Sequence, residues 1–222
     1  MKKLKLFLLI FFFLQVFLKS EIAEKKRFLV MLDPAGHANN VGRKLIEDYE
    51  RTQTFNFAQE LQKRLRERYK IWVVITRYLG EEVVELQNAS FSNRINADLY
   101  IHISMYREEN IKPTIFMYHL VYNPLVDFAK RIFDPYDFIP INQAHFANIN
   151  LTTKYANYMK NYLTQPNFQR WFDLYGFFGI PFKPLVGITA PAIAIELGIC
   201  QEDKWKIFIE PLVESLSFLS DN

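Results

Sequence analysis

A short apolar run that ends abruptly is the feature that most limits how this chain can fold. Residues 28–32 are uninterrupted apolar sequence, and they stop at Asp33 and Pro34 before a glycine and His37. A run of this length, bounded by proline and glycine, predicts a buried strand followed by a turn. Because ligands of open α/β sheets bind at the carboxyl ends of strands, His37 is a candidate functional residue. The alternative is a loop histidine without a role.

The rest of the chain alternates between strand and helix patterns. With 222 residues, half of them hydrophobic, it is long enough to bury one sizeable core. The alternation predicts βαβ units in a single α/β domain, with a mainly parallel or mixed sheet of about five to six strands and helices on both faces. The further strands are expected at 71–76, 98–104, 114–122 and 191–195, and the helices from Glu50 to about 69, at 81–93, at 143–163 in one or two pieces, and at 202–219.

The first twenty residues differ in kind from the remainder. Three lysines precede the apolar stretch 6–18, which only Gln15 interrupts. A charged region followed by an apolar one predicts a secretory signal peptide or an uncleaved N-terminal anchor at residues 1–20. The folded domain is then expected at 21–222, exported to the periplasm or cell envelope, with membrane contact only through the leader.

Charge and cysteine content argue against a nucleic-acid-binding protein and against a small domain held by disulfides. The formal charge is +3, but without the four lysines of the leader it becomes −1, so nothing indicates a nucleic-acid partner. Cys200 is the only cysteine, and an internal disulfide is therefore impossible. The oligomeric state is not predicted.

Polar residues at the expected element ends suggest a metal site. Glu50 stands at a helix start, Glu196 at the end of the last strand, and His102 within the third strand, on the same face as Ser104. Two histidines and one glutamate around an open position are the ligands of a catalytic zinc, and a further carboxylate can act as general base. The alternatives are a carboxylate stabilised by the helix dipole and a histidine satisfied in the core.

Five motifs together resemble the zinc-dependent N-acetylmuramoyl-L-alanine amidases, which are cell-wall hydrolases. Glu50-Arg51, followed by apolar residues five, seven and eight places after Glu50, is similar to the family's second-ligand motif. The other motifs are 32–37, similar to L-D-P-G-H; 74–77, similar to V-x-L-T-R; Asn93 with 96–100, similar to A-N-x-x-x-A-D-L-F; and 191–198, similar to P-A-V-L-V-E-x-G.

The resemblance implies a zinc site and a reaction. His37, Glu50 and His102 would be the zinc ligands and Glu196 the catalytic carboxylate, in a hydrolase that cuts the amide between N-acetylmuramic acid and L-alanine in peptidoglycan. The family enters its third ligand as S-I-H, whereas this chain reads His102-Ile103-Ser104. The two positions lie roughly 6–7 Å apart along a strand, which is more than a zinc–nitrogen bond of about 2 Å absorbs. His119 and His145 are the other candidates.

Two functions of different classes follow. The first is a zinc amidase of peptidoglycan catabolism, favoured because His37, Glu50 and Glu196 are all retained. The second is a non-catalytic amidase-fold protein that binds cell-wall glycan or a cell-envelope partner, favoured by the exchange of His102 and Ser104. An aromatic-rich insertion at 123–175 has no counterpart in the motifs.

Overall fold

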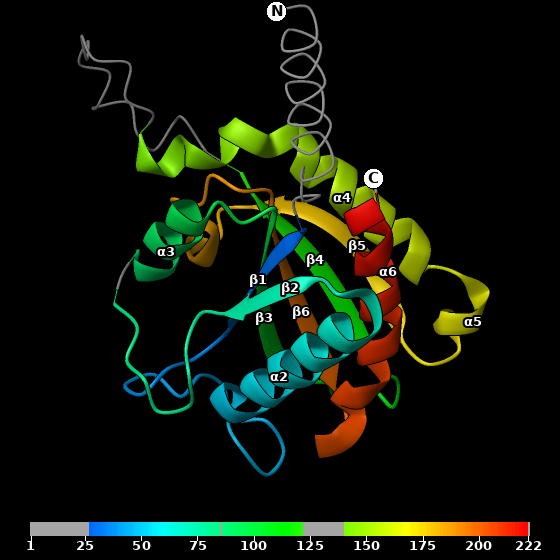
Figure 1. Cartoon of the computed structure of the whole chain (residues 1–222). Coiled ribbons are helices and arrows are strands. Elements are labelled where there is room, and N and C mark those ends of the chain that lie inside the picture. Colours follow the sequence, from blue (N-terminus) through cyan, green and yellow to red (C-terminus); the bar gives the residue numbers. More distant parts are fainter. Residues whose placement is uncertain (1–26, 85, 122–139, 222) are drawn as a thin grey trace, which may run out of the picture.

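One six-stranded sheet forms the centre of the molecule, with the strand order β2-β1-β3-β6-β4-β5 (Figure 1). The computed structural model describes residues 27–84, 86–121 and 140–221, so the predicted leader and residues 123–139 of the predicted insertion lie outside the described part. The strands are β1 (Leu29–Pro34), β2 (Trp72–Ile75), β3 (Leu99–Arg107), β4 (Thr114–Leu120), β5 (Asp173–Ile180) and β6 (Ala192–Ile199).

Strand pairing is parallel except at one junction. β1 pairs in parallel with both β2 and β3, and β3 pairs in parallel with β6. β4 runs antiparallel to β6 and parallel to β5. The prediction of a single, mainly parallel mixed sheet is confirmed, and the carboxyl ends of β1, β3 and β6 share one edge.

Helices cover both faces of the sheet, as predicted. The α-helices are α2 (Glu50–Tyr69), α3 (Gln87–Ile95), α4 (Ile149–Leu163), α5 (Pro166–Gln169) and α6 (Ile209–Asp221), and the 3₁₀ segments are η2 (Ile141–Asn148), η3 (Lys183–Leu185) and η4 (Glu202–Phe208). In the described ranges, no helix is long and apolar enough to cross a membrane.

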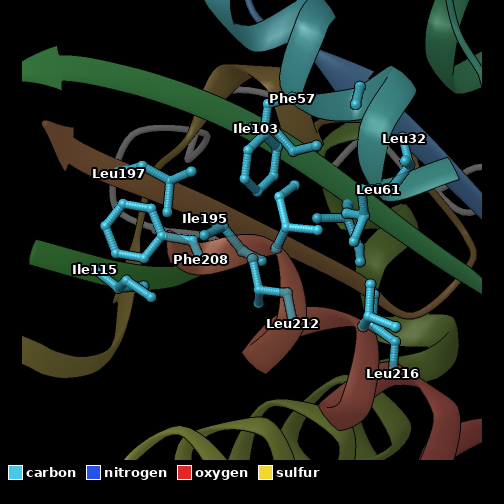
Figure 2. Close-up of a cluster of buried hydrophobic side chains, with 14 of the residues drawn as sticks. Leu32, Phe57, Leu61, Ile103, Ile115, Ile195, Leu197, Phe208, Leu212 and Leu216 are labelled. Atoms are coloured by element: carbon cyan, nitrogen blue, oxygen red, sulfur yellow. The ribbon is translucent and has the colours of Figure 1, made fainter. Parts of the chain in front are cut away.

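The larger hydrophobic core lies between the sheet and helices α2, α4 and α6. Phe57 and Leu61 of α2 and Leu212 of α6 meet Ile103 and Ile195 of the central strands (Figure 2). Fully burying one such side chain stabilises the fold by about 1.5–3 kcal/mol. A smaller cluster on the opposite face joins α3 to residues of β1, β3 and β6. The sheet is therefore fixed on both sides.

Several elements differ from the predictions. The helix expected at 81–93 begins only at Gln87, after Leu86 in a left-handed conformation, and β4 ends at Leu120. β6 continues through Glu196, so this carboxylate lies within the strand and not at its end. β5 was not predicted, because it is an edge strand with two glycines and mixed exposure. The described part of the predicted insertion forms η2, α4, α5 and the start of β5.

Candidate functional site

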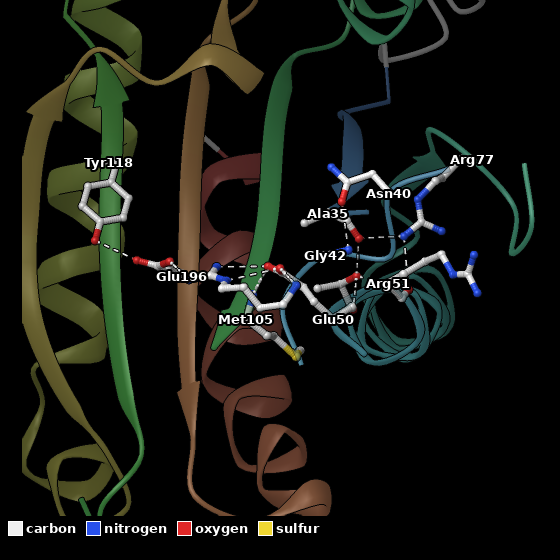
Figure 3. A network of polar contacts seen from close by, with 11 residues as sticks. Ala35, Asn40, Gly42, Glu50, Arg51, Arg77, Met105, Tyr118 and Glu196 are labelled. Carbon is white, nitrogen blue, oxygen red and sulfur yellow. Dashed lines mark hydrogen bonds and ion pairs between the residues drawn. The ribbon is translucent and has the colours of Figure 1, made fainter. Parts of the chain in front are cut away.

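Glu50 is the first residue of α2, and its carboxylate is buried where α2 meets β3. The backbone N–H of Met105 donates a hydrogen bond of 2.8 Å to Oε1 of Glu50 (Figure 3). Only 4% of Glu50 is exposed, so the charge requires compensation inside the protein. The carboxylate also stands in the first turn of α2, where the helix dipole favours a negative charge.

Arg43 supplies that compensation and joins Glu50 to Glu196. Its Nε and Nη2 atoms donate to the two oxygens of Glu50 at 3.2 and 3.0 Å, and its Nη1 donates to Oε1 of Glu196 at 2.7 Å. Burial lowers the pKa of Arg43, but the hydrogen bonds and charges of the two glutamates raise it above its ordinary value. One guanidinium cation therefore holds both carboxylates.

Gly42 allows this close approach of the loop to Glu50. Its φ is +74°, and a Cβ at this position would meet Oε2 of Glu50 at 2.7 Å. A side chain is excluded there by both conformation and space. The backbone N–H of Arg43 can then donate to Oε2 of Glu50 at 3.0 Å.

Glu196 lies opposite Ser104 in the register of β6 and β3. Tyr118 of β4 donates a hydrogen bond of 3.0 Å from its hydroxyl to Oε2 of Glu196 (Figure 3). Burial and the Glu196 carboxylate raise the pKa of Tyr118 well above its usual value, so this hydroxyl stays protonated. Glu196 therefore keeps one oxygen on Arg43 and the other on Tyr118.

His102 is engaged elsewhere, with Asp33 at the end of β1. Nδ1 of His102 lies 2.6 Å from Oδ2 of Asp33, while Thr76 and Asn88 donate to Oδ1 at 2.8 and 2.7 Å. Burial would raise the pKa of Asp33, but the charge of His102 and the hydrogen bonds it receives lower it below its ordinary value. Asp33 is thus an ionised acceptor, and the Nδ1–H of His102 is the donor.

His37 lies in the turn after β1, where it exchanges backbone hydrogen bonds with Asn40. Its Nδ1 is buried and has no hydrogen-bond partner. His37, His102 and Asp33 line a cavity of about 410 Å³ that also includes Arg77. The four predicted site residues therefore divide into two groups: His37 and His102 border this cavity, and Glu50 and Glu196 meet at Arg43.

The two remaining histidines belong to neither group. His119 packs its ring on Phe177 with centroids 4.6 Å apart, and His145 packs on Phe146 at 4.3 Å. Burial lowers the pKa of both imidazoles. They act as packed aromatic side chains in this arrangement.

A zinc ion does not fit these side chains as they are arranged. A catalytic zinc needs three protein ligands that converge and leave one position open. Among the described residues, no group of three or more His, Cys, Asp and Glu side chains is placed to hold a metal ion. Both oxygens of Glu50 are hydrogen-bonded to Arg43, and Nδ1 of His102 is bonded to Asp33. The positive charge between the two glutamates belongs to Arg43.

Comparison with known proteins places the fold. No protein-family model matches the sequence, and no curated protein matches it. Among solved structures, the catalytic domain of CwlV, an N-acetylmuramoyl-L-alanine amidase from Bacillus (Paenibacillus) polymyxa var. colistinus, matches with a TM-score of 0.62 and 17% identity, over 87% of this chain and 98% of that one. The chain has the fold of an amidase catalytic domain.

Two further amidases support this assignment of the fold. N-acetylmuramoyl-L-alanine amidase AmiC2 of Nostoc punctiforme matches with a TM-score of 0.58 and 14% identity, over 86% of this chain and 97% of that one. The CwlD amidase of Clostridioides difficile, solved in complex with the GerS lipoprotein, matches with 0.55 and 12%, over 88% and 100%. The predicted resemblance is confirmed for the fold, and the low identities mark the chain as divergent.

Sequence reasoning missed three residues of the site. Arg43 belongs to none of the motifs, although a basic residue a few positions before a buried glutamate is a candidate ion-pair partner. Asp33 was noted only as the end of a strand. Tyr118 gave no signal, because β4 follows β3 in sequence and its pairing with β6 is not encoded locally. The assignments of His37, Glu50, His102 and Glu196 remain predictions.

Proposed function

We propose that this chain is exported to the cell envelope and binds peptidoglycan through the surface around Glu196, without zinc-dependent hydrolysis. The observation that carries the proposal is the guanidinium of Arg43, which lies between Glu50 and Glu196 and hydrogen-bonds to both. The amidase fold supplies the link to peptidoglycan, since the matching solved structures are N-acetylmuramoyl-L-alanine amidases.

The third strand supports the same proposal. Ser104, and not a histidine, stands opposite Glu196 in the strand register. A serine hydroxyl donates and accepts hydrogen bonds, as a ligand-binding surface requires, whereas imidazole, thiolate and carboxylate are the zinc ligands of proteins. Ser104 itself is buried, at 5% exposure, whereas the side chains of Arg43 and Glu196 are 46% and 22% exposed and make a polar surface suited to hydroxyl and amide groups. The alternative ligand for this surface is a protein of the cell envelope instead of glycan. A binding experiment distinguishes the two.

Hydrolysis of the amide between N-acetylmuramic acid and L-alanine is the second candidate function. The buried Nδ1 of His37 favours it, because a buried polar atom without a partner is costly and is common at functional sites. In that reading Glu196 is the group that moves the proton, and His37, Glu50 and His102 are the predicted zinc ligands. Their present contacts would have to change first.

One set of measurements on the purified protein separates the two candidates. Binding to purified peptidoglycan is measured by co-sedimentation, zinc by elemental analysis after dialysis against zinc, and hydrolysis by the release of soluble fragments with new amino groups. We expect binding, no retained zinc and no release. Stoichiometric zinc together with release that Glu196→Gln abolishes would establish the hydrolase. A protein that neither sediments with peptidoglycan nor releases fragments from it would refute both.

A further inference from the structure

An exposed group of aromatic rings lies beside Glu196 on strands β4 and β5. We call it the aromatic platform, and it consists of Phe116, Tyr118, Tyr175 and Phe178. Phe116 and Tyr175 stack with centroids 4.7 Å apart and planes within 4°, and Phe116 and Tyr118 are parallel within 5° at 6.2 Å. Phe178 packs at 6.3–6.5 Å against the rings of Phe116 and Tyr118. The rings form one ordered surface and not a scatter of single side chains.

The backbone of β5 is shaped to present this platform. The register between β4 and β5 shifts between Ile115 and Phe116, so that Tyr175 is an additional residue in β5. Such a bulge turns a side chain toward one face of the sheet. At Gly176 the φ is +141°, and a Cβ would meet the ring of Phe178 at 3.1 Å. A glycine is required here to let the ring of Phe178 lie down over the strand.

The platform is exposed, although its strands belong to the packed sheet. Tyr175 is 55% exposed and Phe178 is 44% exposed, whereas Ile115 and Met117 on the other face of β4 are fully buried. Contiguous exposed apolar surface in a soluble domain marks a site of interaction. Tyr118 alone of the four packs against a buried cluster, so core burial does not account for Phe116, Tyr175 and Phe178.

Charged and hydroxyl groups border the platform. Tyr118 reaches Glu196 with its hydroxyl, and Arg43, with 46% of its side chain exposed, lies on the far side of the same carboxylate. The guanidinium of Arg43 also lies 5.8 Å from the ring centre of Tyr106, whose own ring is 6.5 Å from Phe116. The aromatic rings of the platform therefore lie directly beside the carboxylate of Glu196 and the guanidinium of Arg43.

This combination matches the chemistry of a sugar ring. A pyranose has an apolar face of C–H bonds, whose partial positive charge suits the negative face of an aromatic ring. Its hydroxyl and acetamido groups need donors and acceptors, which Arg43 and Glu196 supply. An apolar protein surface pressed on the platform would instead bury the Glu196–Arg43 pair without satisfying its remaining hydrogen-bonding capacity, which costs desolvation.

We infer that the aromatic platform, with Glu196 and Arg43, is the subsite that holds the sugar rings of the glycan strand. The inference rests on the proposed function and adds which part of peptidoglycan is recognised: the glycan and not the stem peptide. The sugars stack on Tyr175 and Phe178, and their hydroxyl or acetamido groups bond to the ion pair.

The experiment compares two ligands and four variants of the full protein, one of which is a control. The ligands are peptide-free oligomers of N-acetylglucosamine and the free stem peptide, both followed by titration calorimetry, with co-sedimentation on intact peptidoglycan in parallel. We expect Tyr175→Ala and Phe178→Ala each to weaken oligomer binding about tenfold, as loss of one stacked ring implies. Tyr175→Trp should retain binding, because it keeps a stacking ring.

Trp72→Ala is the matched control, because Trp72 is also 55% exposed but lies on β2, at the opposite edge of the sheet. It should leave oligomer binding unchanged.

The inference is overturned if the platform variants keep native circular dichroism and still bind the oligomer as the unaltered protein does. A preference for the stem peptide would overturn it as well. A changed oligomeric state with unchanged oligomer binding would identify the platform as a protein interface. If both alanine variants bind intact peptidoglycan as tightly as the unaltered protein does, the subsite is wrong while the proposed function stands.

Discussion

Replacement of Arg43 by alanine is the sharpest test of the charge arrangement in the site. The change removes three side-chain contacts at 2.7–3.2 Å, two to Glu50 and one to Glu196. Among the residues that the structure describes, Glu50 then keeps hydrogen bonds only from the backbone N–H groups of Arg43 and Met105. The negative charge of Glu50 is then no longer balanced.

The expected loss of stability follows from these contacts. Removal of one partner from a fully buried ion pair costs about 3–5 kcal/mol. Nearly half of the Arg43 side chain is exposed, and solvent screens the pair, so we expect about 1–3 kcal/mol for Arg43→Ala. In a domain of this size that corresponds to a fall in melting temperature of roughly 3–10 °C. Arg43→Lys should lose less, because it keeps the charge but not the planar set of donors.

Urea denaturation followed by circular dichroism measures the free energy of unfolding for each variant. Arg170→Ala is the control, since Arg170 is exposed and lies 5.2 Å from the ring of Trp171, outside the site. Its free energy of unfolding should change by less than about 0.5 kcal/mol. The reasoning is refuted if Arg43→Ala unfolds at the same urea concentration as the unaltered protein.

The same variant makes a prediction about zinc. Arg43→Ala alone should not retain zinc after dialysis, because a carboxylate pair still lacks a converging imidazole. Arg43→Ala combined with Ser104→His removes the guanidinium and restores a histidine opposite Glu196, and we expect this pair of changes to gain zinc in elemental analysis. If Arg43→Ala alone takes up zinc, Arg43 excludes the metal by itself and the exchange at Ser104 is unimportant.

Further predictions concern the Asp33–His102 pair and the predicted leader at residues 1–20. Because the pKa of Asp33 is lowered in the folded state, its ionised form stabilises the fold above the ordinary value of 3.8, and this contribution is lost as the pH falls through the folded pKa. Asp33→Asn should therefore cost about 2–4 kcal/mol at pH 7, and the difference from the unaltered protein should shrink in urea titrations as the pH falls below 3.8. Asp203→Asn, with a mainly exposed carboxylate, should have little effect. Residues 1–20, fused to a reporter enzyme, should direct it out of the cytoplasm, and N-terminal sequencing of the exported product would distinguish cleavage from anchoring; a cytoplasmic reporter would contradict the predicted export.

Local sequence was sufficient for the elements that it encodes directly. Residues 28–32 predict β1 because they are apolar and end at proline, and α2 follows from the helical spacing of Phe57, Ala58, Leu61 and Leu65. The start of α2 at Glu50 was found for the same reason. β5 was missed, since residues 173–180 have neither alternating nor continuous burial and gain their partner only by pairing with β4.

The site was harder to predict than the fold, because its contacts join residues that are distant in sequence. Glu50 and Glu196 were selected individually, but the cation between them comes from a loop 153 residues before Glu196. No local sequence pattern predicts a contact between residues so far apart in the chain. The left-handed Gly42, which lets the loop approach Glu50, would have been a usable indication, because a glycine just before a basic residue permits a tight turn toward a neighbouring acid.

The exchange of His102 and Ser104 shows what the alternation of side chains along a strand can predict. It predicts the face of the sheet to which a side chain points, but not the residue that the side chain contacts. Both side chains point to the face that carries Glu196, as the sequence predicts. In the parallel register, however, His102 lies beside Asp33, whereas Ser104 lies beside Glu196. Because the histidine stands at 102 and not at 104, its imidazole lies beside Asp33, and the hydroxyl of Ser104 takes the position beside Glu196. His102 then makes a charge-assisted hydrogen bond with Asp33 that needs no metal. The same two residues in the opposite order would place an imidazole next to Glu196, which is why the order, and not the presence, of this histidine decides the chemistry open to the site.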